Sequence, residues 1–197
     1  ARGRRNALEV ELAHALVAAG LKDADPVQKV SIISRGMAGG YTLKLPIEER
    51  RLKTKSQFLA DLAVALGGYV SERVVFKEVS TGASNDLRQA TEIGKKLITQ
   101  YGMSDKLGPR TFGKTQELIF LGREISTEKD YSEEVAALID KEMSAFIGGA
   151  EKTAKNVISA NRRLLETIAK TLMEKESIEH EEFYKIINSH KLKRTAV

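Results

Sequence analysis

Two side chains able to do acid–base or metal chemistry lie three positions apart in an otherwise apolar stretch. Glu9, Glu11 and His14 are the only ionisable residues in the segment 8–21. The apolar residues around them recur at helical spacing on more than one face, which predicts a buried helix. A buried carboxylate or imidazole is costly unless it is paired or bound to a metal. Glu11 and His14 are therefore candidates for a catalytic or metal site, or for a hydrogen-bonded pair that merely satisfies itself.

The composition excludes several classes of protein. The chain has 197 residues, 42% of them hydrophobic, with 32 Lys+Arg against 27 Asp+Glu for a formal net charge of +5, and no cysteine. Its length suffices for a packed core, and the missing cysteine excludes disulfide frameworks, zinc fingers and thiol catalysis. No apolar run approaches the roughly 20 residues of a membrane span. Aromatic residues make up only 6%, so we expect a water-soluble chain with no nucleic-acid partner.

The elements that must position these side chains are mostly helical. Hydrophobic spacing predicts a mainly α fold with one small β element near residues 27–45, made of strands at 27–33 and 41–45. Helices are expected at 6–21, from 54 to about 75 with a break at 67–68, from the loop 80–86 to near 102, at 135–146, at 164–172 and at 180–188. Gly148 and Gly149 are expected to weaken a helix, and residues 190–194 form a basic tail.

The segment Gly108 to Thr115 satisfies the G-x-x-x-x-G-K-[ST] pattern of a phosphate-binding loop. That chemistry needs a buried strand before the loop and a helix after it, so that backbone N–H groups converge on phosphate. The preceding residues 103–107 make a poor strand, and the segment after Thr115 is soon broken by Gly122. We therefore expect a surface loop and no nucleotide binding at Lys114.

An ordered set of segments extends the pattern around Glu11 and His14. The chain contains ELAHALVA at 11–18, DPVQKVSIISRGMAGGYT at 25–42, LGG at 66–68, STGASNDLRQAT at 80–91, YGMSDKLGP at 101–109 and FLGR at 120–123. Together they resemble the peptidase domain of the FtsH family, the membrane-anchored ATP-dependent zinc metalloproteases. The resemblance runs from about residue 7 to residue 188. It implies a helical zinc-protease domain at residues 1–189, with the zinc-site half at about 1–125, a C-terminal helical part at about 130–189, and a basic tail at 190–197.

The resemblance also implies a ligand set that this chain does not complete. In the family motif, two His residues one helical turn apart bind zinc, a Glu activates water, and a later Asp supplies the third ligand. Carried over, Glu11 is the base and His14 and Asp86 are ligands, while Val10 stands at the first His position. Valine has no lone pair, so zinc is expected to be weak or absent and activity impaired. Glu9 points about 100° away and is a poor substitute, and Glu72 is either a supporting partner of the site or an exposed carboxylate.

The family further implies unfolded polypeptide substrates, a homo-hexamer, and a parent protein anchored in a membrane with this domain in the cytoplasm or an organelle interior. The AAA+ ATPase module and the transmembrane segment are not in the printed sequence. Substrate is expected to align along the strand that includes Gly39, Gly40, Tyr41 and Thr42. The competing interpretation is a non-catalytic scaffold that keeps the fold and the assembly surfaces without the chemistry.

Overall fold

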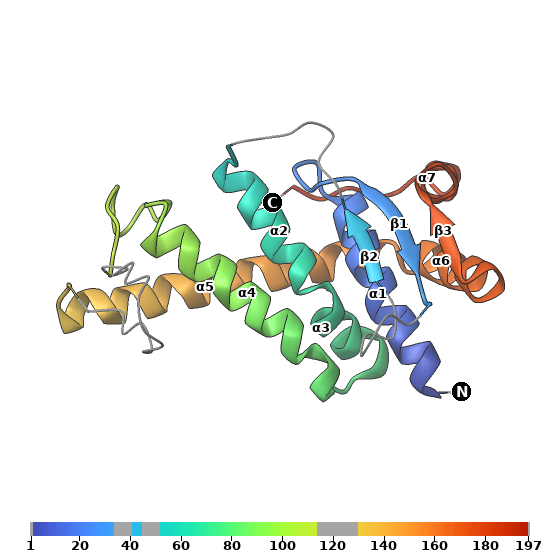
Figure 1. Ribbon diagram of the computed structural model, residues 1–197, viewed down its shortest axis with the longest axis horizontal. Helices are drawn as coiled ribbons and strands as arrows, with labels where there is room; N and C mark the ends of the chain where they lie inside the picture. The colour runs from blue at the N-terminus through green and yellow to red at the C-terminus, as the bar shows by residue number, and fades with distance from the viewer. Residues whose placement is uncertain (1, 34–40, 45–51, 114–129, 197) are drawn as a thin grey trace, which may run out of the picture.

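The chain folds as a set of packed helices with a small sheet on one side (Figure 1). The computed structural model describes residues 2–33, 41–44, 52–113 and 130–196, and the side chains of all of these except 2–7, 9 and 10. In chain order the elements are α1 (Arg2–Gly20), β1 (Val27–Ser31), β2 (Tyr41–Lys44), α2 (Lys55–Ala65), α3 (Gly67–Ser71), the π-helical turn η1 (Glu72–Phe76), the 3₁₀ turn η2 (Thr81–Ala83), α4 (Ser84–Thr99), α5 (Glu133–Ala160), α6 (Arg162–Lys175), β3 (Ser177–Glu179) and α7 (His180–Ser189). The predicted mainly α architecture is confirmed.

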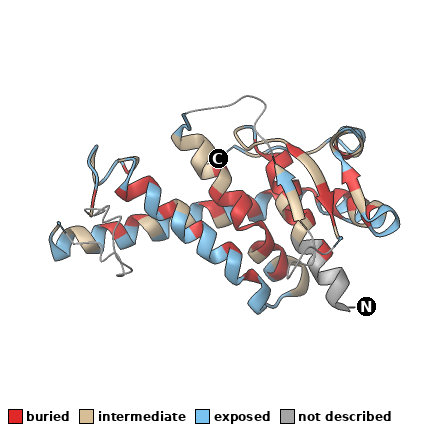
Figure 2. Cartoon of the chain, viewed as in Figure 1, coloured by how far each residue is buried: buried red, intermediate tan, exposed pale blue. Residues whose placement is uncertain are grey.

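Helix α1 is the centre of the molecule. Its apolar residues between Leu12 and Ala18 are almost wholly buried, and α2, α3, α5 and α6 all pack against it. Figure 2 shows this buried zone where α1, α3 and the middle of α5 meet. At the end of α1 the Val157 side chain of α5 packs directly on Gly20, where an added Cβ would lie 2.5 Å from a Val157 methyl carbon. A glycine is therefore required where these two helices touch.

Local sequence signals fix where several helices begin. The Thr54 side chain accepts a hydrogen bond from the backbone N–H of Gln57, and the Gln57 side chain accepts one from the N–H of Thr54, which completes a capping box at the start of α2. The Ser132 hydroxyl caps α5 in the same way by accepting from Val135 N–H. Because a capping side chain satisfies an otherwise unpaired N–H, these residues define helix starts independently of distant contacts.

The sheet has the strand order β2-β1-β3 with antiparallel pairing throughout. Thr42 of β2 lies opposite Val30 of β1, and Val30 lies opposite Ile178 of β3 on the other side. Among the described strands, β2 is therefore an edge strand with one side open. Strand β3 was not predicted, because a three-residue segment carries no period and becomes a strand only by pairing with β1.

The glycine pair Gly148 and Gly149 does not break α5, which is a continuous 28-residue helix through both positions. That the pair weakens the helix stays a prediction. Ala150, Ala154 and Val157 are buried against the core on one side of the pair, and that packing outweighs a propensity cost of about 1 kcal/mol per glycine.

Residues 103–113 form turns and irregular structure without a strand, while Lys114 and Thr115 lie outside the described residues. In the described part of the chain, no helix is both long and apolar enough to cross a membrane.

Candidate active site

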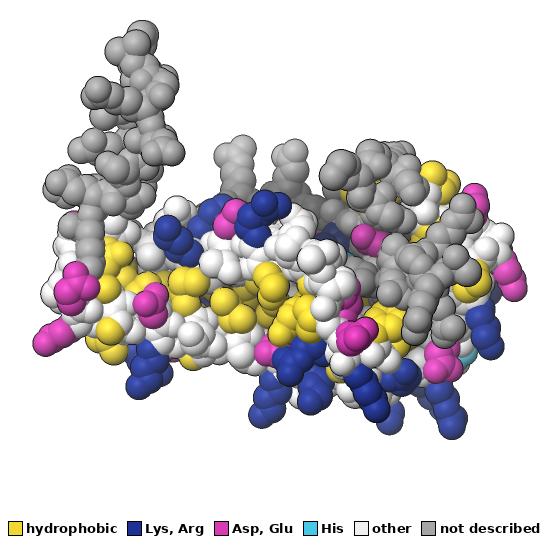
Figure 3. Space-filling view, turned by 90° about the horizontal axis from the view of Figure 1, so that it is seen from below, with side chains coloured by type: hydrophobic (Ala, Val, Ile, Leu, Met, Phe, Trp, Pro, Cys, Tyr) yellow, Lys and Arg dark blue, Asp and Glu magenta, His cyan; other side chains and the backbone are white. Residues whose placement is uncertain are grey.

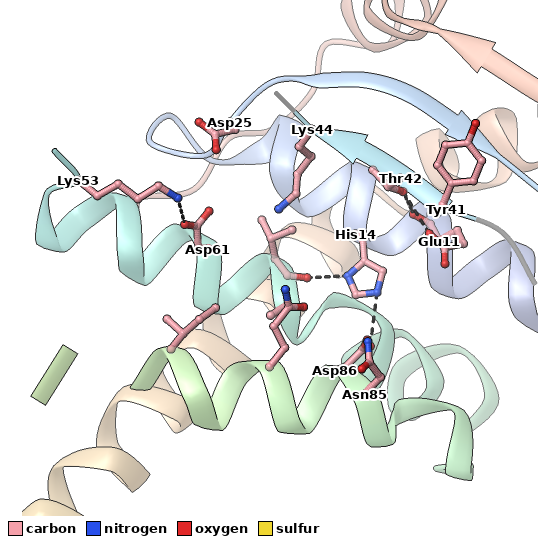
Figure 4. Close-up of a pocket in the computed structure, with 14 residues that line it drawn as sticks. Glu11, His14, Asp25, Tyr41, Thr42, Lys44, Lys53, Asp61, Asn85 and Asp86 are labelled. Atoms are coloured by element: carbon pink, nitrogen blue, oxygen red, sulfur yellow. Dashed lines mark hydrogen bonds and ion pairs between the residues drawn. The ribbon is translucent and has the colours of Figure 1, made fainter. Parts of the chain in front are cut away.

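A cleft of about 460 Å³ lies between α1, β2, α2 and α4. Figure 4 shows His14 of α1, Lys44 of β2, Asp61 of α2 and Asp86 of α4 around it. The cleft is lined by Glu11, His14, Asp25, Tyr41, Thr42, Lys44, Lys53, Asp61, Val64, Ala65, Asn85, Asp86, Gln89 and Ile93. It therefore contains most of the residues that the sequence singled out, together with several that it did not.

His14 is held in one orientation by the backbone of α2. Its Nδ1 lies 2.7 Å from the carbonyl oxygen of Val64, so Nδ1 carries a proton and donates it. That bond directs Nε2 toward α4 and, in the neutral ring, leaves its lone pair free. Gly67 packs closely against the same histidine, since an added Cβ at Gly67 would lie 3.2 Å from the backbone and from Nδ1 of His14. The Leu-Gly-Gly sequence thus allows α3 to begin directly against the imidazole.

Asp86 reaches the same point from α4. Its Oδ2 atom lies 3.4 Å from Nε2 of His14. Asp86 is only 8% exposed, and its Oδ2 is a buried side-chain atom without a hydrogen-bond partner among the described residues. Burial on its own would lower the pKa of His14, but the neighbouring Asp86 carboxylate and the Val64 carbonyl outweigh it, so the pKa of His14 lies above its ordinary value.

The turn that leads into α4 is organised by Glu72. This carboxylate is buried and accepts hydrogen bonds of 2.6 Å from both the backbone N–H and the hydroxyl of Ser80. The Ser80 hydroxyl oxygen in turn accepts from Gly82 N–H. Of the two sequence-based interpretations of Glu72, an exposed carboxylate is wrong, because Glu72 fixes the loop from which α4 presents Asp86.

Glu11 faces the cleft one turn before His14 and is held by β2. The Thr42 hydroxyl lies 3.0 Å from the Glu11 carbonyl oxygen and 3.3 Å from its Oε2. Burial raises the pKa of the Glu11 carboxyl above its ordinary value, against the lowering effects of His14 and of the Thr42 hydroxyl. No hydrogen bond between the side chains of Glu11 and His14 is found in the described structure. The two residues are therefore not the self-satisfied pair that the sequence left open.

Lys44 occupies the far end of the cleft, two residues along β2 from Thr42 (Figure 4). Asp61 faces it but forms its ion pair with Lys53 at 2.6 Å, and Asp25 is the other nearby carboxylate. Burial lowers the pKa of the Lys44 ammonium below its ordinary value despite both carboxylates. Sequence analysis did not single out Lys44 or the Val64 carbonyl. The alternation of β2 was the only available signal, because it places Thr42 and Lys44 on one face.

The donor set fits zinc only in part. Two ligands of one tetrahedral zinc ion lie about 3.4 Å apart, given zinc–ligand distances of about 2.0–2.2 Å. The observed separation of 3.4 Å between His14 Nε2 and Asp86 Oδ2 agrees with that spacing. A catalytic zinc needs three protein ligands, and within the described residues no three His, Cys, Asp or Glu side chains are placed to hold a metal. Val10 supplies no donor atom, so the residues do not fit a firmly held catalytic zinc.

Only some of the remaining predicted site residues lie in the part of the chain that the structure describes. Tyr41 and Thr42 line the cleft from β2, whereas Gly39 and Gly40 lie outside the described residues. Val10 belongs to α1, one turn before His14, but its side chain and that of Glu9 are not among those described. The structure thus brings Glu11, His14 and Asp86 to one cleft, although His14 and Asp86 are 72 positions apart in the sequence.

Comparison with known proteins places the chain in a family. A family model described as Peptidase family M41 matches residues 7–186. The protein named ATP-dependent zinc metalloprotease FtsH 1 from Sphaerobacter thermophilus is 52% identical over 172 residues, covering 87% of this chain and 26% of that protein. The ATP-dependent zinc metalloprotease FtsH from Chloroflexus aggregans is 51% identical over 180 residues, covering 90% and 27%.

A third relative, from Veillonella parvula and also named ATP-dependent zinc metalloprotease FtsH, is 50% identical over 86% of this chain and 26% of its own length. The chain therefore spans about a quarter of the length of the curated relatives it matches. The match covers the cleft and the helices around it. The chain belongs to peptidase family M41 and is a peptidase domain of the FtsH type.

Proposed function

We propose that this chain is the proteolytic domain of a longer ATP-dependent protease of the FtsH type, with an active site that no longer holds zinc firmly. One observation carries the proposal. Glu11, His14 and Asp86 meet in one cleft, while the position one helical turn before His14 is a valine. A helix with its second imidazole at that position would complete a three-ligand site.

The expected consequence is a loss of metal affinity rather than a loss of fold. A structural zinc site is worth about 10–16 kcal/mol with its full ligand set, so one missing ligand removes several kcal/mol, or a few decades of affinity. Glu11 keeps a raised pKa suited to a general base. In a chain without bound zinc it has no acidified water to act on. We therefore propose that peptide cleavage is strongly impaired.

Polypeptide binding does not depend on the missing ligand. The open edge of β2 can pair with an extended chain and align it beside Glu11 and His14. Tyr41 and Thr42 line the cleft on that strand. Unfolded polypeptides are the proposed ligands, because an extended backbone without its own secondary structure is the form that a sheet edge accepts.

The wider setting of the domain is also a proposal. The relatives are named as ATP-dependent zinc metalloproteases, and the matched part of this chain covers 26% and 27% of their length. We propose that the full-length protein couples this domain to an AAA+ ATPase module, is anchored in a membrane with this domain in the cytoplasm or an organelle interior, and assembles as a homo-hexamer. Family membership supports this assignment.

A non-catalytic scaffold is the second candidate function. The incomplete donor set favours it, since no third His, Cys, Asp or Glu side chain among the described residues joins His14 and Asp86 in a metal-binding arrangement. A domain of this kind would bind polypeptide, or hold an assembly together, without cutting.

Metal content and cleavage of the purified chain separate the two functions. We expect less than stoichiometric zinc and no measurable casein cleavage, and a gain of zinc in Val10→His. Val10→Ala is the matched control, because it removes the same side chain without adding a donor. The proposed defect would be refuted if the native chain already binds one zinc tightly and cleaves casein, and if Val10→His improves neither zinc affinity nor cleavage.

A further inference from the structure

The basic C-terminal segment is fixed to the body of the protein. Thr195 N–H donates to the carbonyl oxygen of Gly20 at 3.0 Å. The side chain of Asn161, between α5 and α6, donates to the carbonyl of Lys193 at 2.9 Å and accepts from its N–H at 2.8 Å. Asn161 is only 6% exposed, so these two hydrogen bonds to the Lys193 backbone are shielded from water. The segment predicted as a tail thus has a defined place beside the start of α6.

A hollow of about 590 Å³ lies between that segment and the junction of α5 and α6. Positive charge gathers unevenly on the protein, as the row of Lys and Arg side chains along the lower edge of Figure 3 illustrates for one face. The hollow is lined by Ser159, Ala160, Asn161, Arg162, Arg163, Leu164, His190, Lys191 and Lys193. Four of these nine side chains carry a permanent positive charge, and none is a carboxylate.

Within the described residues, the four cations have no carboxylate as an ion-pair partner. The side chains of Arg162, Arg163, Lys191 and Lys193 make no ion pair or hydrogen bond with any residue that the structure describes. Elsewhere exposed lysines do find carboxylates, as Lys175 does with Glu182 at 2.5 Å. Like charges held close together repel one another, and an anion placed among them relieves that repulsion.

The first turn of α6 lies beside the same hollow. Its N-cap residue is Asn161, but the side chain of Asn161 is occupied with Val157 O and Lys193 and gives α6 no cap hydrogen bond. The first turn of α6 also carries no acidic residue. The last turn of α5 ends at the same junction with the opposite helix-dipole sign, so the positive field of the hollow comes from its side chains.

We propose that this hollow is a binding site for the phosphate group of an anionic ligand. The guanidinium groups of Arg162 and Arg163 offer planar forks of donors that match phosphate oxygens, and the two lysines add charge. No Phe, Tyr or Trp side chain lines the hollow, so a compact phosphate fits it better than a nucleic acid, whose bases need stacking platforms. The site lies away from the Glu11 cleft and does not depend on the proposed protease function.

Titration with inorganic tripolyphosphate tests the proposal. We expect binding that weakens on raising the salt concentration, since exposed charges are screened beyond about 10 Å at 0.1 M salt. Arg162→Gln/Arg163→Gln should weaken binding roughly 25-fold, at about fivefold per exposed charge. The matched control is Lys95→Gln/Lys96→Gln, which removes the same charge from exposed positions on α4. Both pairs lie on the surface, and circular dichroism will check that each variant folds.

Two results would overturn the site: no binding at millimolar tripolyphosphate, or an equal loss in both double variants, which would indicate a response to net charge alone. A second experiment distinguishes a lipid headgroup from a free phosphate ligand. It measures sedimentation of the protein with phosphatidylcholine vesicles that contain or lack phosphatidylglycerol. Sedimentation with the anionic vesicles, reversed by tripolyphosphate and lost in Arg162→Gln/Arg163→Gln, assigns a lipid headgroup. Tripolyphosphate binding without vesicle binding assigns a free phosphate ligand, and both outcomes support the site.

Discussion

Two buried carboxylates on neighbouring helices have opposite surroundings. Asp86 on α4 and Glu142 on α5 are 8% and 6% exposed. Glu142 accepts from the Ser104 hydroxyl at 2.7 Å with one oxygen, and its other oxygen pairs with Lys106 at 2.8 Å. Asp86 faces His14 at 3.4 Å, and its Oδ2 has no hydrogen-bond partner among the described residues. Equal burial therefore comes with full satisfaction in one case and an orphaned acceptor in the other.

The difference is what we expect if Glu142 is a structural carboxylate and Asp86 is a ligand. A buried acceptor without a partner costs about 1–3 kcal/mol, so native structures keep few of them. Glu142 ties the loop after α4 to α5, with both of its oxygens engaged. Asp86 directs into the cleft an oxygen that faces Nε2 of His14 and has no hydrogen-bond partner among the described residues. We infer that Asp86 is retained for what it can bind rather than for what it contributes to stability.

The largest expected effect concerns zinc. Val10→His should raise zinc affinity roughly 10³-fold, because a third ligand on the same turn of α1 completes the set. In that background Asp86→Asn should remove the gain, while Glu142→Gln should leave zinc affinity unchanged. Competition with a fluorescent zinc chelator measures all three variants. Equal losses from the two carboxylate changes would erase the distinction between a ligand and a structural group.

The next effect concerns stability. Glu142→Gln should lower the free energy of unfolding by about 2 kcal/mol, because it weakens hydrogen bonds from Ser104 and Lys106 to a charged acceptor. The control is Asp140→Asn, an exposed carboxylate on the same helix, which should change stability by less than about 0.5 kcal/mol. Urea unfolding followed by circular dichroism gives both values.

The same variant has a pH signature. The hydrogen bonds from Lys106 and Ser104 lower the pKa of Glu142 below its ordinary value of 4.5. A carboxyl whose pKa is lower in the folded state stabilises the fold above its unfolded pKa, and that stability is lost as the pH falls through the folded pKa. The stability difference between the native chain and Glu142→Gln should therefore be full at pH 7 and shrink below pH 4.5. A difference that grows on acidification would contradict this assignment.

A smaller effect is expected from the glycines of α5. A Cβ added at Gly148 or Gly149 would meet nothing within 4 Å. Each change to alanine should stabilise the protein by up to about 1 kcal/mol through backbone entropy and helix propensity. Thermal unfolding checks this, and zinc binding in the Val10→His background should not change. A loss of stability would show that the glycines are needed for a contact outside the described residues.

The smallest effect is expected from Asp86→Asn in the native chain. The change replaces the carboxylate beside His14 with a neutral amide, and His14 can lose its proton and stay bonded to Val64 O, so no charge is stranded. We expect the free energy of unfolding to change by less than about 1 kcal/mol, against about 2 for Glu142→Gln. Urea unfolding of the two variants side by side is the direct comparison. A loss at Asp86 as large as that at Glu142 would make Asp86 a structural residue.

Much of the secondary structure could be predicted because its signals are local. The cap at Thr54, the capping-rich loop before α4 and the apolar period of α1 are all read from neighbouring residues. Strand β3 and the continuity of α5 could not be predicted in this way. The first exists only through pairing with β1, and the second depends on packing that outweighs two unfavourable glycines.

The site divides along a similar line. Glu11 and His14 were recognisable from the sequence, because two polar groups inside an apolar helix need partners. Asp86 was assigned only through the family resemblance, since nothing in its own segment indicates a contact 72 positions away. Thr42 and Lys44 show why: one residue holds Glu11 and the other sits at the far end of the same cleft, yet both belong to a four-residue strand whose sequence is unremarkable.

The sequence by itself determined the family, the mainly α architecture and the absence of a donor atom at position 10, because composition, period and residue chemistry do not depend on folding. Tertiary structure decided which atoms face one another. The Val64 carbonyl fixes the His14 ring, α4 carries Asp86 to Nε2, and Asn161 fastens the basic segment beside α6. These contacts join residues from 32 to 72 positions apart, and only the packing of the helices between them sets those distances.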